Sequence, residues 1–240
     1  MRADWNPVVV HDKCFGFGFD AVSNEFKVVR IILYKDNLEL LNRELVSSVS
    51  VFSLGRKTWR KLDYEALFEM HSRSCNVGGF VYRLTSAVGR RLLKIVSFDL
   101  STEVFAGIAC PDEARFGMDS LPELTIFRDS LALLCEWDKK RYHIWVMKGD
   151  GGVDKSWRKF FSVDLDVVVR VPEQRIVGFS MKGLMLVVGE GNVVVSPIVE
   201  DVEVVKYLPP CPESAWHVES YVESLALLKE GEIQPSNLVM

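Results

Sequence analysis

The fold class of this 240-residue chain is decided by residues 15–30, which read Phe15-Gly16-Phe17-Gly18-Phe19-Asp20-Ala21-Val22-Ser23-Asn24-Glu25-Phe26-Lys27-Val28-Val29-Arg30. Both ends of this stretch are rich in aromatic or β-branched residues, and a short polar segment separates them, which is typical of two strands joined by a turn. Phe26 follows Phe19 by seven residues. The stretch therefore predicts a hairpin whose second strand places one large aromatic side chain against a neighbouring sheet.

The same pattern recurs along the chain. A strand-ending aromatic residue is followed seven residues later by another in the next two copies, whereas the fourth copy needs an insertion of about five residues around Gly149 to Gly152. The copies start at Phe19, Phe52, Phe98, Trp145 and Val195; their second aromatic residues are Phe26, Trp59, Phe105 and Trp157, and the last, degenerate copy has Val202, Val204 and Val205 instead. We expect Trp59, Phe105 and Trp157 to be equivalent residues on the fourth strands of successive blades, with Trp59 buried between blades.

The spacing of the copies predicts the architecture. They start 33, 46, 47 and 50 residues apart, and a further strand pair precedes each of the last three. Four short strands every 45–50 residues is the period of propeller blades such as kelch or WD repeats. We therefore predict an all-β, propeller-like fold of about four to five four-stranded blades, truncated or open at its N-terminal end. The short first interval places Phe19 and Phe52 in one blade.

The strand quartets give the expected limits of the blades: residues 15–62, 75–108, 124–163 and 176–208. A terminal strand at 221–228 is left over, and it either pairs with Val8–Val10 in a thin fifth blade or leaves the ring open. Only Asp63–His71 has helical spacing, enough for two turns.

Composition excludes several classes of protein. Hydrophobic residues make up 48% and charged residues 26%, as in globular domains, and a net charge of −4 argues against a dedicated nucleic-acid binder. The sequence has no secretory signal and no apolar run long enough to span a membrane. The five cysteines are scattered, which predicts reduced thiols and a cytoplasmic protein, with the nucleus as the alternative.

Several segments, in this order, resemble the F-box-associated domain of plant F-box proteins, including the S-locus F-box group: 15–30, 51–54 with 59–62, 97–100 with 103–105, 142–147 with 156–157, and 221–225. The resemblance covers about residues 15–228. It implies a kelch-like domain that recognises a target protein for a cullin ubiquitin ligase.

Members of this family usually begin with an F-box followed by a stretch ending in Leu-Trp-Asn-Pro, and here only Trp5-Asn6-Pro7 resembles the end of that stretch. We therefore expect residues 1–14 to be the remnant of a truncated first blade, 15–230 the propeller-like domain, and 231–240 a tail. Without an F-box, binding to the Skp adaptor and to cullin is not expected.

The motifs that could support catalysis are weak. Gly16 to Ala21 fits G-x-G-x-x-A, but a strand rather than a helix is predicted after it, so the glycines are better explained by close backbone approach in an inner strand. The four histidines lie far apart, no serine has a G-x-S-x-G context, and the paired carboxylates lie in predicted loops. We predict no enzymatic activity, no cofactor and no metal site.

Charged loops are the candidate binding site. In a propeller, the loops between second and third strands and the crossovers between blades lie on one face, and mixed charges there suit protein recognition. The candidates are Arg90, Arg91, Asp112, Glu113, Lys139, Lys140, Arg141, Asp164 and Asp166. For Lys139 to Arg141, a solvated hairpin turn is an equal alternative.

These observations leave three hypotheses for the function. The first is a protein-binding domain of the F-box-associated type whose partner the sequence does not identify. The second is a propeller enzyme or a carbohydrate-binding lectin, which predicts converging carboxylates, histidines or exposed aromatic side chains in a channel. The third is a truncated gene product without function. Capture of partners, with and without Skp adaptor, separates them.

Overall fold

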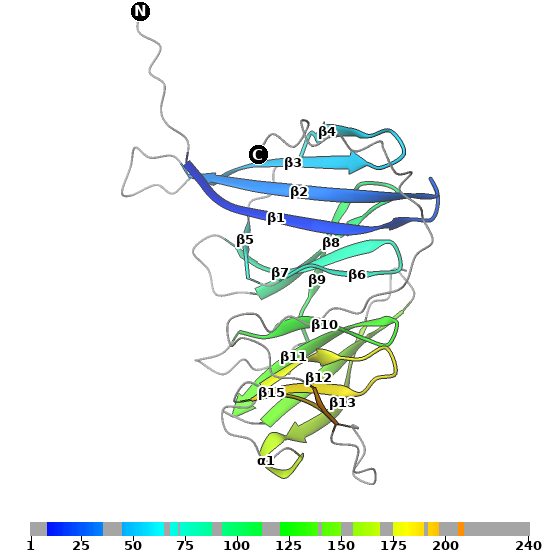
Figure 1. Cartoon of the computed structure of the whole chain (residues 1–240). Coiled ribbons are helices and arrows are strands. Elements are labelled where there is room, and N and C mark those ends of the chain that lie inside the picture. Colours follow the sequence, from blue (N-terminus) through cyan, green and yellow to red (C-terminus); the bar gives the residue numbers. More distant parts are fainter. Residues whose placement is uncertain are drawn as a thin grey trace, which may run out of the picture.

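A computed structural model of the chain describes residues 9–35, 45–64, 68–71, 73–87, 93–111, 121–138, 141–149, 156–168, 175–189, 192–196 and 206–208. Within these ranges the backbone forms short strands and one helical turn (Figure 1). The elements are β1 (Val9–Asp20), β2 (Glu25–Lys35), β3 (Leu45–Ser53), β4 (Thr58–Leu62), β5 (Phe68–Met70), β6 (Cys75–Val77), β7 (Phe80–Ala87), β8 (Leu93–Asp99), β9 (Phe105–Ala109), β10 (Glu123–Phe127), β11 (Ser130–Asp138), β12 (Arg141–Lys148), β13 (Ser156–Asp164), α1 (Leu165–Val168), β14 (Arg175–Phe179), β15 (Met185–Gly189), β16 (Asn192–Ser196) and β17 (Lys206–Leu208).

Hydrogen bonds join these strands into four antiparallel sheets, which we number along the chain. The first sheet has the order β1-β2-β3-β4, the third β10-β11-β12-β13 and the fourth β14-β15-β16-β17. The second has the order β5-β7-β8-β9, with β6 also pairing with β7. The prediction of an all-β, propeller-like fold is confirmed, and each sheet corresponds to one predicted blade.

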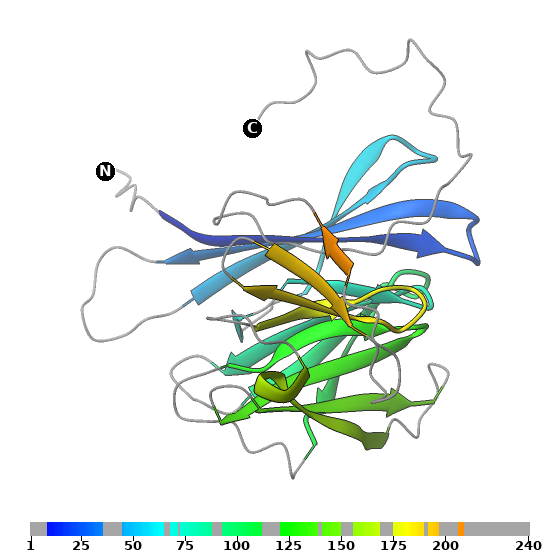
Figure 2. The ribbon, with the colours of Figure 1, turned by 60° about the horizontal axis from the view of Figure 1, so that its bottom comes forward.

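The direction of the strands defines two ends of the molecule. Neighbouring strands of each sheet run in opposite directions, so the turns after its first and third strands lie at one end. Figures 1 and 2 show these hairpin turns gathered on one side of the molecule. We call this end the turn face. The opposite end, where the second and third strands are joined and the chain passes to the next sheet, is the crossover face.

Three hairpins share one loop design, which explains the seven-residue spacing in the sequence. The last residue of the first strand, Asp20, Ser53 or Asp99, accepts hydrogen bonds from backbone N–H groups of the loop through its side-chain oxygen. The fourth loop residue then turns the chain through a positive φ: 53° at Asn24, 54° at Lys57 and 60° at Glu103. This local geometry pairs Phe19 with Phe26, Phe52 with Trp59, and Phe98 with Phe105.

The third sheet departs from this spacing. Trp157 pairs with Met147 rather than with Trp145, and a register shift lies between Ile144 and Trp145. The fourth copy of the pattern therefore begins two residues later than predicted. Even so, the prediction that Trp59, Phe105 and Trp157 lie on the last strands of successive sheets is confirmed, because they lie on β4, β9 and β13.

The predicted burial of Trp59 is wrong. The Trp59 side chain is 45% exposed, because β4 is the outer edge strand of the first sheet and nearly all of its residues are exposed. The Trp59 ring packs against Phe52 at 5.3 Å between ring centres, and the Arg30 guanidinium carbon lies 4.4 Å from the Trp59 ring centre. The residue is thus supported by its own sheet rather than by a neighbouring blade.

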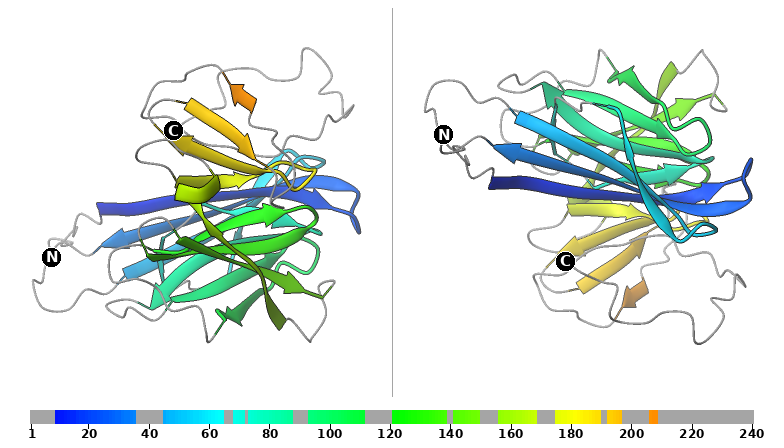
Figure 3. Two further views of the ribbon diagram at one scale, coloured as in Figure 1. Left: turned by 90° about the horizontal axis from the view of Figure 1, so that it is seen from below. Right: turned by 90° about the horizontal axis from the view of Figure 1, so that it is seen from above.

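Each sheet packs against the next one along the chain through a buried apolar cluster. One cluster joins Cys14, Val29 and Leu33 of the first sheet to Phe98 of the second. A second joins Leu84 and Ile95 of the second sheet to Leu131 and Leu133 of the third, and a third joins Ile144 of the third sheet to Met185 and Val187 of the fourth. In both views of Figure 3, the second and third sheets lie on one side of β1 and β2, and most of the fourth sheet lies on the other.

Successive residues of β1 point alternately toward the second sheet and away from it. Cys14, Gly16 and Gly18 face the second sheet, whereas Phe15 and Phe17 point away from it and are 52% and 57% exposed. A Cβ atom on Gly16 would overlap Val81 and lie 2.9 Å from Val29 Cγ1. The glycines of the G-x-G-x-x-A motif therefore allow β1 to approach the second sheet closely, and β2 follows in place of the helix that a dinucleotide site needs.

Replacing Gly16 with alanine will lower the free energy of unfolding by about 1–3 kcal/mol, because the stiff β-branched side chains of Val29 and Val81 cannot move aside freely. Urea denaturation followed by tryptophan fluorescence measures the effect. Gly107→Ala is the matched control, since a Cβ atom there has nothing within 4 Å. Equal stability of the two variants would contradict the close approach of β1.

Three details differ from the sequence-based expectations. Asp63–His71 is not helical where it is described, because Phe68–Met70 forms β5 and extends the inner edge of the second sheet beside β6. Val9 and Val10 do not start a separate blade but pair with Lys35 and Tyr34 in β1, which begins before Phe15. The helical turn α1 lies in the crossover after β13. The terminal strand predicted at 221–228 lies outside the described residues.

Candidate functional site

Three of the nine predicted site residues lie in the described part of the chain, all on the crossover face. Arg141 begins β12 and Asp164 ends β13, and Arg141 Nε lies 3.1 Å from Asp164 Oδ2. The backbone N–H of Asp166 donates to Asp164 Oδ1 at 3.2 Å. Because the Arg141 side chain is 63% exposed, this ion pair contributes about 0–1 kcal/mol to stability. The other six, Arg90, Arg91, Asp112, Glu113, Lys139 and Lys140, lie outside the described residues.

A groove that sequence reasoning missed lies at the turn face, between the second, third and fourth sheets. Its volume is about 740 Å³, within the range of ligand-binding clefts. It is lined by the β6–β7 turn, the β10–β11 turn, the end of β12, part of β13 and the end of β14. The lining residues are Asn76, Val77, Gly78, Phe80, Tyr82, Ile126, Arg128, Asp129, Ser130, Leu131, Val146, Met147, Lys148, Gly149, Arg158, Phe160, Phe179, Ser180 and Met181.

The groove has an apolar interior and a charged rim. Tyr82, Leu131 and Phe179 are buried at its base, where they also belong to the cores between the sheets. Phe160 and Met181 are 47% and 60% exposed and line the same groove. The groove therefore offers apolar contact area to a ligand.

The rim carries Arg128, Lys148 and Arg158, and Asp129 is the one carboxylate among the described lining residues. None of the lining residues that the structure describes is a histidine or a cysteine. Burial, followed by the charge of Asp99, raises the pKa of the Tyr82 hydroxyl, so this phenol stays neutral at physiological pH.

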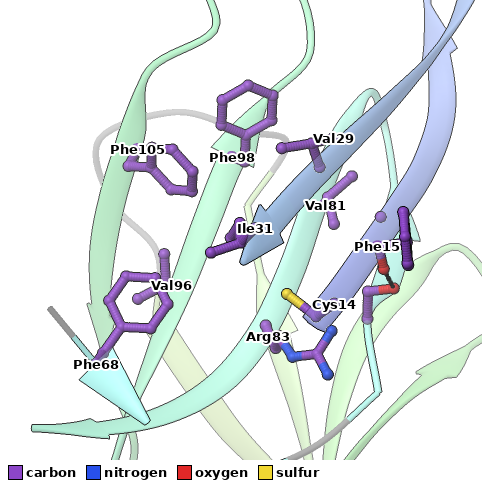
Figure 4. Close-up of a pocket in the computed structure, with 12 residues that line it drawn as sticks. Cys14, Phe15, Val29, Ile31, Phe68, Val81, Arg83, Val96, Phe98 and Phe105 are labelled. Atoms are coloured by element: carbon purple, nitrogen blue, oxygen red, sulfur yellow. Dashed lines mark hydrogen bonds between the residues drawn. The ribbon is translucent and has the colours of Figure 1, made fainter. Parts of the chain in front are cut away.

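A second cavity, between the first and second sheets, is a packing defect. It has a volume of about 20 Å³, and apolar side chains including Val29, Val81 and Phe98 line it (Figure 4). Such a space holds one water molecule at most. Figure 4 shows the Cys14 thiol pointing into this region beside Arg83, and burial raises the pKa of Cys14 to about 11.

The four cysteines that the structure describes are mostly buried. None of Cys14, Cys75, Cys110 and Cys135 is in a disulfide, and all but Cys110 are buried. Burial raises the pKa of Cys110 to about 11 and that of Cys135 to about 12, so both stay protonated at neutral pH. The predicted reduced, mostly buried thiols are confirmed for these four residues, and Cys211 lies outside the described ranges.

No group of three or more His, Cys, Asp or Glu side chains in the described part of the chain is placed to hold a metal ion. No helix there has the length and apolar character needed to cross a lipid bilayer.

Four antiparallel sheets that follow one another along the chain and pack through successive cores define a β-propeller-type domain. A family model described as the F-box associated beta propeller domain matches residues 10–216. The chain belongs to this family, which confirms the resemblance seen in the sequence.

Curated relatives agree with this assignment. F-box protein CPR1 of Arabidopsis thaliana is 28% identical over 165 residues, which cover 62% of this chain and 40% of the relative. F-box protein At3g07870 of the same plant is 31% identical over 175 residues, which cover 64% of this chain and 41% of the relative. Putative F-box protein At4g17780, also of Arabidopsis thaliana, is 28% identical over 163 residues, which cover 67% of this chain and 39% of the relative. The matched regions thus span about two fifths of the length of these relatives.

Proposed function

We propose that this domain binds a target protein and presents it for ubiquitination by a cullin ligase when joined to an F-box. The observation that supports this most directly is the turn-face groove, which combines exposed apolar side chains with a charged rim in a domain of the F-box-associated family. Apolar anchors surrounded by polar groups are the usual composition of a protein-recognition surface. The mixed-charge loops of the crossover face remain a second proposed contact area.

The alternative of an enzyme or lectin has less support. A glycosidase-type site needs two carboxyl groups facing one substrate, and the described part of the groove lining has one carboxylate, Asp129. We therefore propose a binding domain without catalytic activity or cofactor. Its free thiols fit a reducing compartment, so we place its action in the cytoplasm or the nucleus.

Affinity purification with the whole 240-residue chain tests the proposal. The proteins captured from a plant cell extract, identified by mass spectrometry, are compared between the wild type and the Phe160→Asp/Met181→Asp double variant. Leu121→Asp is the matched control, because Leu121 is as exposed as Met181, at 60%, and does not line the groove. We expect a set of proteins that the control retains and the double variant loses. Identical sets from all three chains would contradict the groove as the binding site.

Purified Skp adaptor added to the same experiment separates target binding from ligase assembly. We expect no stoichiometric complex between this chain and the adaptor on size-exclusion chromatography, because the groove is proposed to recognise the target and not the adaptor. A stable complex formed by the two purified proteins would contradict this part of the proposal.

A further inference from the structure

The groove rim contains a residue held in an unfavourable backbone conformation. Arg128 is the first residue of the two-residue turn between β10 and β11, and its φ is 55°. Glycine or asparagine is preferred at such a position, because a longer side chain costs free energy there. Residues kept in such conformations tend to lie at functional sites. The turn therefore keeps an arginine where glycine would be the more stable choice.

The side chain of Arg128 is also held in place. Its guanidinium carbon lies 5.4 Å from the Phe127 ring centre. A Cβ atom on Gly183 would lie only 3.2 Å from Arg128 Nε, so the glycine leaves room for the guanidinium group. The positive charge is thus positioned at the groove by the ring below it and by the β14–β15 loop.

The described lining of the groove carries three cations and one carboxylate. Arg128, Lys148 and Arg158 come from the β10–β11 turn, the end of β12 and the middle of β13, with Asp129 among them. None of the three cations has an ion pair with another residue in the described part of the chain. An excess of positive charge along the described lining favours a ligand that supplies negative charge.

The exposed apolar side chains of the groove favour a ligand that has an apolar part as well as negative charge. Phe160 and Met181 expose large apolar surfaces beside the three cations. A nucleic-acid site would need a broader basic face than three residues on a chain of net charge −4. Building on the protein-binding function proposed above, we propose that the groove binds an extended acidic segment of the target, in which Asp or Glu side chains flank one bulky apolar side chain.

A peptide selection tests this inference. A phage-displayed library of random twelve-residue peptides is selected against the whole chain, and the most enriched peptide is then measured by fluorescence anisotropy. We expect enriched sequences with at least two Asp or Glu residues around a large apolar residue. Raising the salt concentration from 50 to 500 mM should weaken their binding severalfold, because the rim charges are exposed.

Two variants separate binding from stability. Arg158→Ala should weaken the selected peptide about tenfold, whereas Lys159→Ala, which removes the same charge from the next residue of β13 outside the groove lining, should leave affinity unchanged. Arg128→Gly should weaken binding by a similar factor and yet raise the melting temperature by about 2–4 °C, because it relieves the positive φ. A purely structural role for Arg128 would not produce this opposite pair of effects.

Several results would overturn the acidic-segment assignment. These are enriched peptides that are neutral or basic, no peptide retained above background, equal affinities of the Arg158→Ala and Lys159→Ala variants, and tighter binding of a phosphoserine-containing peptide or an RNA oligonucleotide. If one of these occurs while the Phe160→Asp/Met181→Asp variant still loses its captured proteins, the groove remains the target site and only the ligand class is wrong.

Discussion

Replacing Lys27 with methionine will lower the free energy of unfolding by about 3–5 kcal/mol. Lys27 Nζ lies 2.8 Å from Asp20 Oδ2 and 3.3 Å from Glu103 Oε1, and it donates a hydrogen bond to the Leu100 carbonyl at 2.7 Å. The side chains of Lys27 and Asp20 are only 8% and 2% exposed. Methionine keeps the apolar stem but leaves Asp20 and Glu103 facing each other without their shared cation.

Urea denaturation of the variant at pH 7 measures this loss. Lys61→Met on the exposed strand β4 is the control, and its effect should stay within about 0.5 kcal/mol. A loss below 1 kcal/mol for Lys27→Met would mean that the two sheets do not depend on this cluster.

The same cluster predicts how stability changes in acid. Burial alone would raise the pKa of Asp20, but hydrogen bonds from Lys27, Ser23 and Val22 outweigh it and lower the pKa to about 2. The ordinary carboxyl of the unfolded chain has a pKa near 3.9. Ionised Asp20 therefore stabilises the fold fully above about pH 4, and this contribution is lost as the pH falls to about 2. Lys27→Met should flatten this part of the pH–stability curve.

Replacing Phe98 with alanine will lower the free energy of unfolding by about 3–5 kcal/mol, whereas Trp59→Ala will lower it by about 1 kcal/mol. The two residues belong to corresponding aromatic pairs in the second and first sheets. Phe98 is 2% exposed, and its ring centre lies 4.6 Å from that of Phe105 in the core between the sheets. Its removal therefore leaves a cavity. Trp59 is 45% exposed and loses mainly contacts with Phe52 and Arg30.

The two variants are compared by thermal and chemical denaturation of the same preparation. Each is the control for the other, because both truncate an aromatic side chain next to the same kind of loop. Equal losses would show that the outer edge of the first sheet is covered in solution.

The sequence predicts the sheets well, because their limits depend on local geometry. An Asp or Ser that accepts hydrogen bonds from its own loop, followed by a residue with positive φ, fixes the spacing from Phe98 to Phe105 whatever lies around the hairpin. Burial of Trp59 was predicted wrongly, because exposure depends on which neighbouring sheet covers a face, and that contact is distant in the sequence. The break of the second sheet's inner strand into β5 and β6 has no comparable local signal.

The binding groove was harder to predict for the same reason. Its lining comes from three sheets, and Tyr82, Arg158 and Met181 come together only after the sheets have packed. The Arg128-Asp129 turn was visible as a break between two apolar runs, but the sequence does not reveal that its φ is positive. By contrast, the pairing of Arg141 with Asp164 follows directly from the register of β12 and β13.

The order of the buried clusters has a consequence for cooperativity. The described clusters couple each sheet to its neighbour in the chain, as in a one-dimensional array, so the free energy of local opening should differ between an end sheet and an inner one. A ligand in the groove contacts the second, third and fourth sheets at once. Occupancy should therefore slow amide hydrogen exchange in those three sheets together, while the first sheet keeps opening at close to its own rate. Target binding would thus stabilise the second, third and fourth sheets against local opening and leave the opening of the first sheet unchanged.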